Sequence, residues 1–122
     1  MILWIALGGA AGSVLRYLIG GVVQRAGGGG FPVGTLVVNV SGCFLIGIIA
    51  QHYMNMQVHP VMRTLLITGF CGGYTTFSAF SLETAGLVQG GEYGKAATYM
   101  ILSLVLSIAA TFAGFAAARV AA

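Results

Sequence analysis

The stretch GFCGGYTTFSAFSLE, residues 69–83, is the part of this chain on which its fold and function depend. It lies within a long apolar run, yet it contains a glycine pair, several hydroxyl side chains and two phenylalanines three positions apart. Glycine is unfavourable inside a helix, and polar side chains are costly inside a membrane. The stretch therefore predicts a membrane helix that is interrupted near its middle, beside polar and aromatic side chains.

Composition places the chain among membrane proteins. Its 122 residues are 58% hydrophobic and only 6% charged, which is too apolar for a soluble domain of this size. The first segment, 2–23, contains only one charged residue, Arg16, and three further runs contain none: 26–62, 64–82 and 96–118. Each is long enough to cross a hydrocarbon core of about 30 Å, which takes about 20 helical residues.

These runs predict an all-α membrane protein, with a single four-helix transmembrane domain over residues 1–122. The long continuous apolar runs do not show the alternation of membrane barrel strands. The first segment has no basic residue at its start, so we do not expect it to be a signal peptide. We expect the helices at about 2–24, 33–53, 62–88 and 94–119, with the third broken mid-membrane at Gly72 and Gly73.

The positive charges give the chain almost no preferred orientation in the membrane. Arg63 and Arg119 lie on the side of the N-terminus, here called side A. Arg25 and Lys95 lie on the opposite side, side B, and Arg16 joins them if it leans that way. Because Lys and Arg near the ends of the spans set orientation, this balance predicts that the chain inserts both ways and pairs as an antiparallel homodimer.

Two classes of function are poorly supported. The net charge of +3 comes from basic residues scattered along the spans, so there is no basic patch for nucleic acid. The chain has no Asp, and its two Glu are nine residues apart at a loop boundary. No catalytic constellation is present in the sequence, and we do not expect an enzyme.

Polar side chains occupy one layer between the membrane centre and side B. Asn39 in the second helix, Tyr99 and Ser103 in the fourth, and residues 77–81 in the third fall at matching depths. One interpretation is hydrogen bonding between closely packed helices. The other is a polar pathway, since polar groups in a bilayer tend to face a partner or a pathway. The fourth helix continues the layer as a stripe at every fourth residue: Tyr99, Ser103, Ser107 and Thr111.

Small residues follow a helical spacing of their own. Gly8, Gly12 and Gly20 recur at multiples of four in the first helix, which predicts a stripe for close helix packing. Cys43 and Cys71 both fall in apolar segments without metal-ligand spacing, so we interpret them as small packing residues.

The break at Gly72–Gly73 frees carbonyl and amide groups that lipid cannot satisfy. Carbonyls at the end of the first half-helix give the gap partial negative character, which suits a cation such as Na⁺. The second half-helix begins at Thr75–Thr76, where a hydroxyl can cap its free amides. A structural cation site and a plain packing kink both remain open.

Aromatic and charged residues flank the break. The ring edges of Phe77 and Phe80 carry positive electrostatic character, so together with hydroxyls and the Asn39 amide they can receive a small anion. Arg16 and Glu83 lie toward side B at the rim of the membrane. They either pair with each other, or Arg16 raises the local potential and gathers anions at an entrance.

With these features together, the chain resembles the Fluc (CrcB) fluoride channels over essentially its full length. The resemblance rests on GGAAGSVLRY at 8–17, GTLVVNVSGCFLIG at 34–47 and the stretch at 69–83, with Tyr99 and Ser103 fitting the fourth helix. It implies a dual-topology homodimer of antiparallel subunits in the cell (inner) membrane. The dimer would pass fluoride passively through two pores and so relieve fluoride toxicity.

The resemblance also implies roles for individual residues. The backbone carbonyls of Gly72 and Thr75 from both subunits would hold a structural Na⁺ that is not transported. Arg16 matches the first-helix arginine of the family and Glu83 the glutamate after the aromatic motif, whereas Ala79 departs from the family, because many members have Thr there. The fluoride pathway would be lined by Asn39, Phe77, Ser78, Phe80, Tyr99 and Ser103.

Two other functions compete with a channel. A small multidrug transporter also has four short helices, but it normally needs an acidic residue in its first helix, where this chain has Arg16 and no acid. A structural or assembly subunit would use the polar layer only for helix packing.

Overall fold

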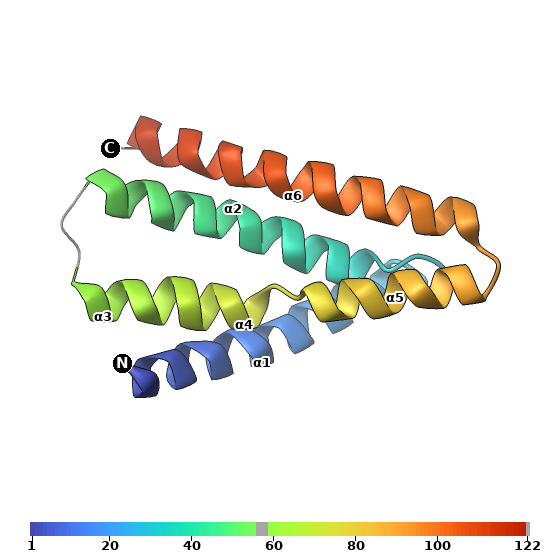
Figure 1. Cartoon of the computed structure of the whole chain (residues 1–122), viewed down its shortest axis with the longest axis horizontal. Coiled ribbons are helices and arrows are strands. Elements are labelled where there is room, and N and C mark those ends of the chain that lie inside the picture. The colour runs from blue at the N-terminus through green and yellow to red at the C-terminus, as the bar shows by residue number, and fades with distance from the viewer. Residues whose placement is uncertain (56–58, 122) are drawn as a thin grey trace.

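The computed structural model describes residues 1–55 and 59–121, and its regular elements are all helices. Four apolar helical segments are long enough to cross a membrane, which confirms the predicted all-α membrane fold. Three of them are single helices: α1 (Ile2–Ala26), α2 (Val33–Asn55) and α6 (Tyr93–Ala121). The N-terminus and the end of α6 lie at the same end of the bundle, side A (Figure 1).

The third span is composite. It starts as a short turn, α3 (Pro60–Arg63), continues as a π-helix, η1 (Thr64–Cys71), and ends its first half with α4 (Gly72–Tyr74). After two extended residues, α5 (Phe77–Gln89) forms the second half. Figure 1 shows α4 and α5 as separate coils joined by a short stretch of extended chain near the middle of the bundle.

The interruption lies later in the chain than the sequence predicted. Gly72 and Gly73 are helical, whereas Thr75 (φ −81°, ψ 153°) and Thr76 (φ −146°, ψ 114°) are extended. The glycines serve packing instead: a Cβ at Gly73 would come within 2.6 Å of the Gly9 carbonyl oxygen. The prediction of the break at the glycine pair was therefore wrong in position. A glycine can be required because another helix approaches too closely for a side chain, and not only because the backbone bends there.

Helix α1 packs against the first half of the third span through the predicted glycine stripe. An added Cβ at Gly8 would strike the backbone at Leu65, and one at Gly12 would strike the carbonyl oxygen of Phe70. Such backbone contact is how membrane helices without a hydrophobic driving force gain van der Waals energy. It fixes α1 beside η1 and α4, close to the interruption.

Helices α2 and α6 form the second tight pair, and they run in the same direction, from side B to side A (Figure 1). A Cβ at Gly47 would strike the Thr111 backbone, and one at Gly114 would strike the Phe44 carbonyl oxygen. This contact sets the register between the two helices. It places Asn39 and Cys43 of α2 opposite the earlier turns of the α6 polar stripe.

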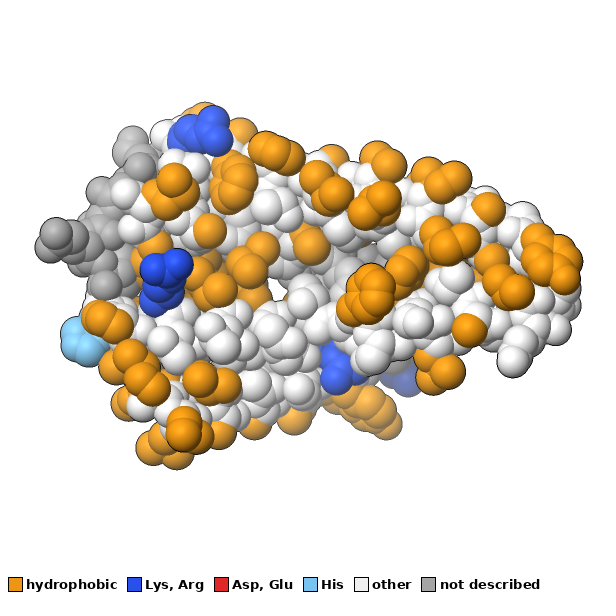
Figure 2. All heavy atoms as spheres, viewed as in Figure 1, with side chains coloured by type: hydrophobic (Ala, Val, Ile, Leu, Met, Phe, Trp, Pro, Cys, Tyr) orange, Lys and Arg blue, Asp and Glu red, His pale blue; other side chains and the backbone are white. Residues whose placement is uncertain are grey.

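The outer surface of the chain carries many large hydrophobic side chains, whereas only a few side chains are fully buried. Large hydrophobic side chains on α6 are exposed, among them Leu104, Val105 and Phe112. The space-filling view shows hydrophobic side chains spread over the whole visible face, with few Lys or Arg among them (Figure 2). An apolar exterior of this kind is suited to contact with lipid.

Candidate functional site

The interruption of the third span is held by one side chain from α2. The Asn39 Nδ2 donates to the Thr76 carbonyl oxygen at 3.1 Å, and the Thr76 backbone N–H donates to Asn39 Oδ1 at 2.8 Å. Both backbone groups of Thr76 are thereby satisfied where lipid could not satisfy them. Asn39 therefore acts on the backbone of the break.

Thr76 also starts the second half-helix. Its Oγ1 accepts a hydrogen bond from the Ala79 backbone N–H at 3.1 Å, as an N-cap residue does. The predicted hydroxyl cap is therefore confirmed, with Thr76 in that role. Thr75 closes the preceding helix instead, because its N–H and its Oγ1 both donate to the Cys71 carbonyl oxygen.

Two backbone carbonyls at the break are left without their usual helical donors. The Thr76 N–H, which would serve the Gly72 carbonyl, goes to Asn39, and the Ala79 N–H, which would serve Thr75, goes to the Thr76 hydroxyl. The Gly73 carbonyl oxygen between them accepts from Ser13 Oγ at 3.5 Å and Arg16 Nε at 3.2 Å. The carbonyls of Gly72 and Thr75 are thus among the acceptors freed at this point, and carbonyl oxygens are suitable ligands for Na⁺.

A different kind of metal site finds no support. Within residues 1–55 and 59–121 there is no group of three or more His, Cys, Asp and Glu side chains that could hold a metal ion.

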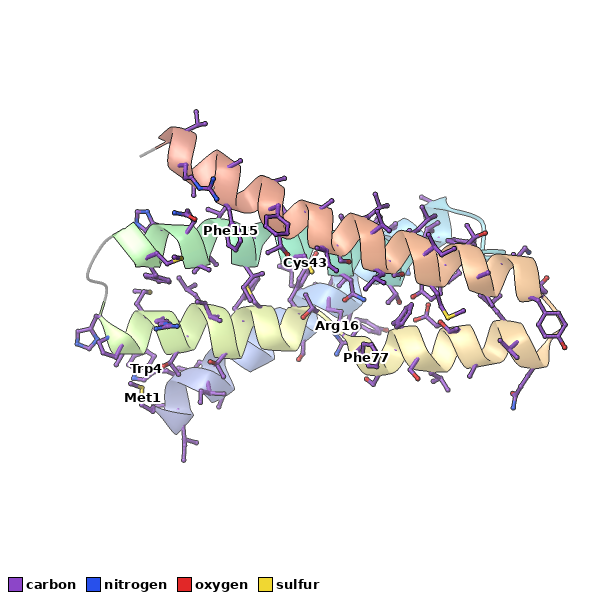
Figure 3. All side chains as sticks on the ribbon, turned by 45° about the horizontal axis from the view of Figure 1, so that its top comes forward. Met1, Trp4, Arg16, Cys43, Phe77 and Phe115 are labelled. Carbon is purple, nitrogen blue, oxygen red and sulfur yellow. The ribbon has the colours of Figure 1, made fainter. Side chains whose placement is uncertain are left out.

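A groove of about 420 Å³ opens beside the break, between α2, α5 and α6. It contains four of the residues expected to line an anion pathway: Asn39, Phe77, Phe80 and Ser103. Its walls are mostly apolar, and the rings of Phe77 and Phe80 lie 5.6 Å apart between centroids. Figure 3 shows Phe77 at the start of α5, next to the interruption.

Ser103 lines this groove with a buried hydroxyl that lacks a partner. The residue is 9% exposed, and its Oγ is buried without a hydrogen-bond partner in the described part of the chain. A buried hydroxyl left unpaired costs about 1–3 kcal/mol, so such groups usually have a ligand or water in the functional protein. The Ser103 hydroxyl is therefore a buried polar group of this groove that still lacks a hydrogen-bond partner.

Tyr99 and Ser78 occupy different places from the other four. Tyr99 is fully buried, its ring lies 5.1 Å from that of Phe80, and its hydroxyl donates to Glu83 Oε2 at 3.4 Å. Ser78 is exposed, and its Oγ lies 3.3 Å from Thr76 Oγ1. Tyr99 thus lies between the groove and the carboxylate on side B, whereas Ser78 stands beside the helix cap.

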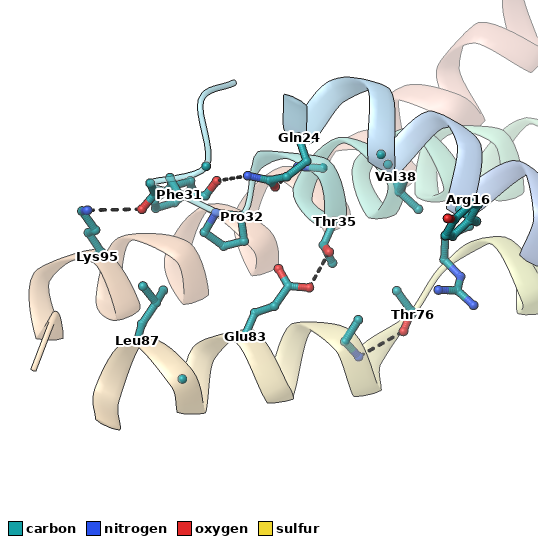
Figure 4. A pocket seen from close by; sticks show the side chains of 18 of the residues that line it. Arg16, Gln24, Phe31, Pro32, Thr35, Val38, Thr76, Glu83, Leu87 and Lys95 are labelled. Carbon is teal, nitrogen blue, oxygen red and sulfur yellow. Dashed lines mark hydrogen bonds between the residues drawn. The ribbon is translucent and has the colours of Figure 1, made fainter. Parts of the chain in front are cut away.

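A second cavity, a cleft of about 920 Å³, lies toward side B. Arg16, Lys95 and Glu83 line this cleft (Figure 4), and Glu92 does too, so its wall carries two positive and two negative side chains. Glu83 Oε1 accepts from Thr35 Oγ1 at 2.5 Å. Thr76 lines both the cleft and the groove, so the two cavities meet at the break.

Arg16 and Glu83 do not form an ion pair. Arg16 donates to the Gly73 carbonyl, and Glu83 is bound by Thr35 and Tyr99. In the part of the chain that the structure describes, the single salt bridge joins Lys95 and Glu92 at 3.3 Å. The structure therefore contradicts the ion pair, and the role of Arg16 in gathering anions at an entrance stays a prediction.

Sequence reasoning did not assign several residues to the site. Thr35 and Ser13 act through single hydrogen bonds to a carboxylate and a carbonyl, whereas Cys43, interpreted as a packing residue, and Ser107, placed on the polar stripe, both line the groove. Their helical spacing was the available signal: Cys43 is one turn from Asn39, and Ser107 is one turn from Ser103. Spacing alone does not show which face of a helix borders a cavity.

Comparison with known proteins assigns the chain to a family. The family described as "CrcB-like protein, Camphor Resistance (CrcB)" matches residues 3–115. A protein of Rhizobium meliloti (strain 1021) named "Fluoride-specific ion channel FluC" is 50% identical over 119 residues, covering 97% of this chain and 95% of its own length.

Two further relatives carry the same name. The one from Rhizobium etli is 51% identical over 120 residues, covering 96% of this chain and 94% of its own. The one from Nitrobacter winogradskyi is 49% identical over 120 residues, covering 98% and 95%. On the family match and on this similarity over almost its whole length, the chain belongs to the CrcB family.

Proposed function

We propose that this protein is a fluoride-selective channel, not an enzyme, that lets F⁻ leave the cell passively and so relieves fluoride toxicity. The observation that carries the proposal is the groove in which the unpartnered Ser103 hydroxyl lies in the same walls as the Phe77–Phe80 pair. The relatives named as fluoride-specific channels support the choice of ion.

The chemistry of the groove suits a small anion. Fluoride is strongly hydrated, so a narrow pathway must replace its water with hydrogen-bond donors. The Ser103 hydroxyl and the positive ring edges of Phe77 and Phe80 provide donors at one depth, and Asn39 lies beside them. A larger halide would fit the same donors poorly, so the groove would select fluoride over other halides by size and hydrogen-bond geometry.

The route to the groove starts at the cleft on side B. Lys95 is paired with Glu92 there, so Arg16 would be the residue of this wall that attracts anions. Thr76 is shared by the cleft and the groove, so an ion that passes the break remains next to polar groups. Arg16, Glu83, Ser78 and Tyr99 would act on this side of the pathway.

The working unit in this proposal is an antiparallel homodimer in the inner membrane. A single copy leaves the groove open on one side, with Phe77 79% exposed, and a second copy would close it. The free carbonyls of Gly72 and Thr75 supply only part of the oxygen shell that a cation needs. Two copies related by a twofold axis would supply both pairs around one structural Na⁺, and the weak charge bias of the spans would permit the opposite insertion.

The proposal is tested by flux from proteoliposomes loaded with fluoride or chloride. We expect F⁻ efflux to exceed Cl⁻ efflux greatly, and we expect Phe77→Ile and Phe80→Ile to reduce it. Phe112→Ile is the matched control, because Phe112 is an exposed ring on the outer face of α6. Equal flux of the two halides, or equal behaviour of all three variants, would refute the channel function.

A further inference from the structure

The groove extends beyond the residues assigned to the anion pathway, toward side A. Helices α2 and α6 are parallel and touch through their backbones at Gly47 and Thr111. One turn earlier on each helix lie Cys43 and Ser107, and both line the groove. The wall therefore consists of two levels, Asn39 with Ser103 and then Cys43 with Ser107, before the helices close.

We infer that the Cys43 thiol lines the fluoride pathway one turn beyond Asn39, toward side A, and is a modification site for small thiol-reactive electrophiles that enter it. The inference rests on the proposed function for the identity of the pathway. The unpartnered Ser103 hydroxyl, nine-tenths buried in the same groove, independently indicates that a ligand occupies this space.

The two cysteines of the chain differ in their access to the groove. Cys43 is partly exposed and lines the groove, whereas Cys71 is 2% exposed and lies outside the groove-lining residues. Figure 3 shows Cys43 between the helices at the level of the interruption. A reagent in the groove thus meets the Cys43 thiol and not that of Cys71.

A suitable probe is methyl methanethiosulfonate, which is small and uncharged and so is not repelled by an anion pathway. The Cys43 sulfur attacks the sulfenyl sulfur of the reagent, a new S–S bond forms, and the S–SO₂ bond breaks. Methanesulfinate leaves and the thiol proton passes to water, so that Cys43 is oxidised to a mixed disulfide and the sulfonyl group is reduced. The methylthio group left on Cys43 adds bulk to the groove wall, one turn before the backbone contact at Gly47.

The test uses the full chain in proteoliposomes as wild type, Cys43→Ser and Cys71→Ser. Mass spectrometry measures labelling, and fluoride efflux is expressed relative to each variant's own untreated rate. We expect the reagent to label Cys43 and to remove most of the efflux from wild type and Cys71→Ser, with recovery after dithiothreitol. Cys43→Ser should keep its untreated rate in the presence of the reagent.

Fluoride itself provides a second readout. If the ion occupies the same space, fluoride in the buffer should slow labelling of Cys43 several-fold, whereas chloride should not. An unlabelled Cys43, labelling that leaves the flux unchanged, or equal inhibition of Cys43→Ser would each overturn the inference. Absence of fluoride efflux from untreated wild type would refute the proposed function, and labelling of Cys43 would still report separately whether the groove is open to the reagent.

Discussion

Replacing Asn39 by alanine should destabilise the protein through the backbone of Thr76. The amide makes two hydrogen bonds to that residue, at 2.8 Å and 3.1 Å, and the truncation leaves a donor and an acceptor unpaired. Each unpaired buried group costs about 1–3 kcal/mol of unfolding free energy, so the two groups together would cost about 2–6 kcal/mol if no water reached them. Because Asn39 borders an open groove that water can enter, we expect the lower end, about 2 kcal/mol.

The measurement is the free energy of unfolding in mixed micelles, by titration with a denaturing detergent. Thr98→Ala is the matched control: its hydroxyl donates to the Gly94 carbonyl of its own helix at an exposed position, and the loss should stay within about 0.5 kcal/mol. Asn39→Asp separates the two bonds, since it keeps the acceptor for the Thr76 N–H but turns an oxygen toward the Thr76 carbonyl. We expect it to be at least as unstable as Asn39→Ala. If Asn39→Ala costs no more than Thr98→Ala, the amide does not hold the break and the reasoning fails.

Four further outcomes follow from the packing and the break. Gly12→Ala should lose about 1–3 kcal/mol of unfolding free energy because its Cβ meets the Phe70 carbonyl, whereas Gly86→Ala, with open space around it, should be neutral or slightly stabilising. Thr76→Val should lose the α5 cap, about 1 kcal/mol, and Thr76→Ser should retain it; equal stability of the two would argue against the cap. Prolonged exchange of Na⁺ for N-methylglucamine on both sides should slow fluoride efflux, and unchanged efflux would count against the cation. Ala79→Thr should raise efflux by adding a hydroxyl to the cleft wall, and an unaltered rate would show that this hydroxyl has no part in conduction.

The four spans could be predicted because charge-free length is a direct requirement of the bilayer. The runs 26–62, 64–82 and 96–118 lack charges because they cross the hydrocarbon core. Helix α2 lies within the first run, and the third span and α6 overlap the second and the third. The π-helix of η1 could not be predicted, because no residue pattern in 64–71 marks it; in the structure it is the segment against which α1 packs.

Within the site, residue chemistry was easier to predict than position. A hydroxyl cap at the start of the second half-helix was predicted from Thr75–Thr76, yet the partner of the Thr76 backbone is 37 residues away in α2. Periodicity predicted that Tyr99 and Ser103 lie on one stripe. It did not predict that the Tyr99 hydroxyl binds Glu83 while the Ser103 hydroxyl stays unpaired. These distinctions depend on which turn of a neighbouring helix stands opposite, and one sequence does not contain that information.

The hydrogen bond from Arg16 to the Gly73 carbonyl has a consequence for the biosynthesis of the chain. The two residues are 57 positions apart, so at roughly 5–20 residues per second the ribosome needs roughly 3–12 seconds to supply the acceptor after the arginine. During that interval the guanidinium has no protein carbonyl of the third span to bind, and we expect it to extend toward the lipid headgroups of side B. Translocation of the third span would then draw the arginine inward, so that α1 reaches its final depth only after more than half of the chain has been made.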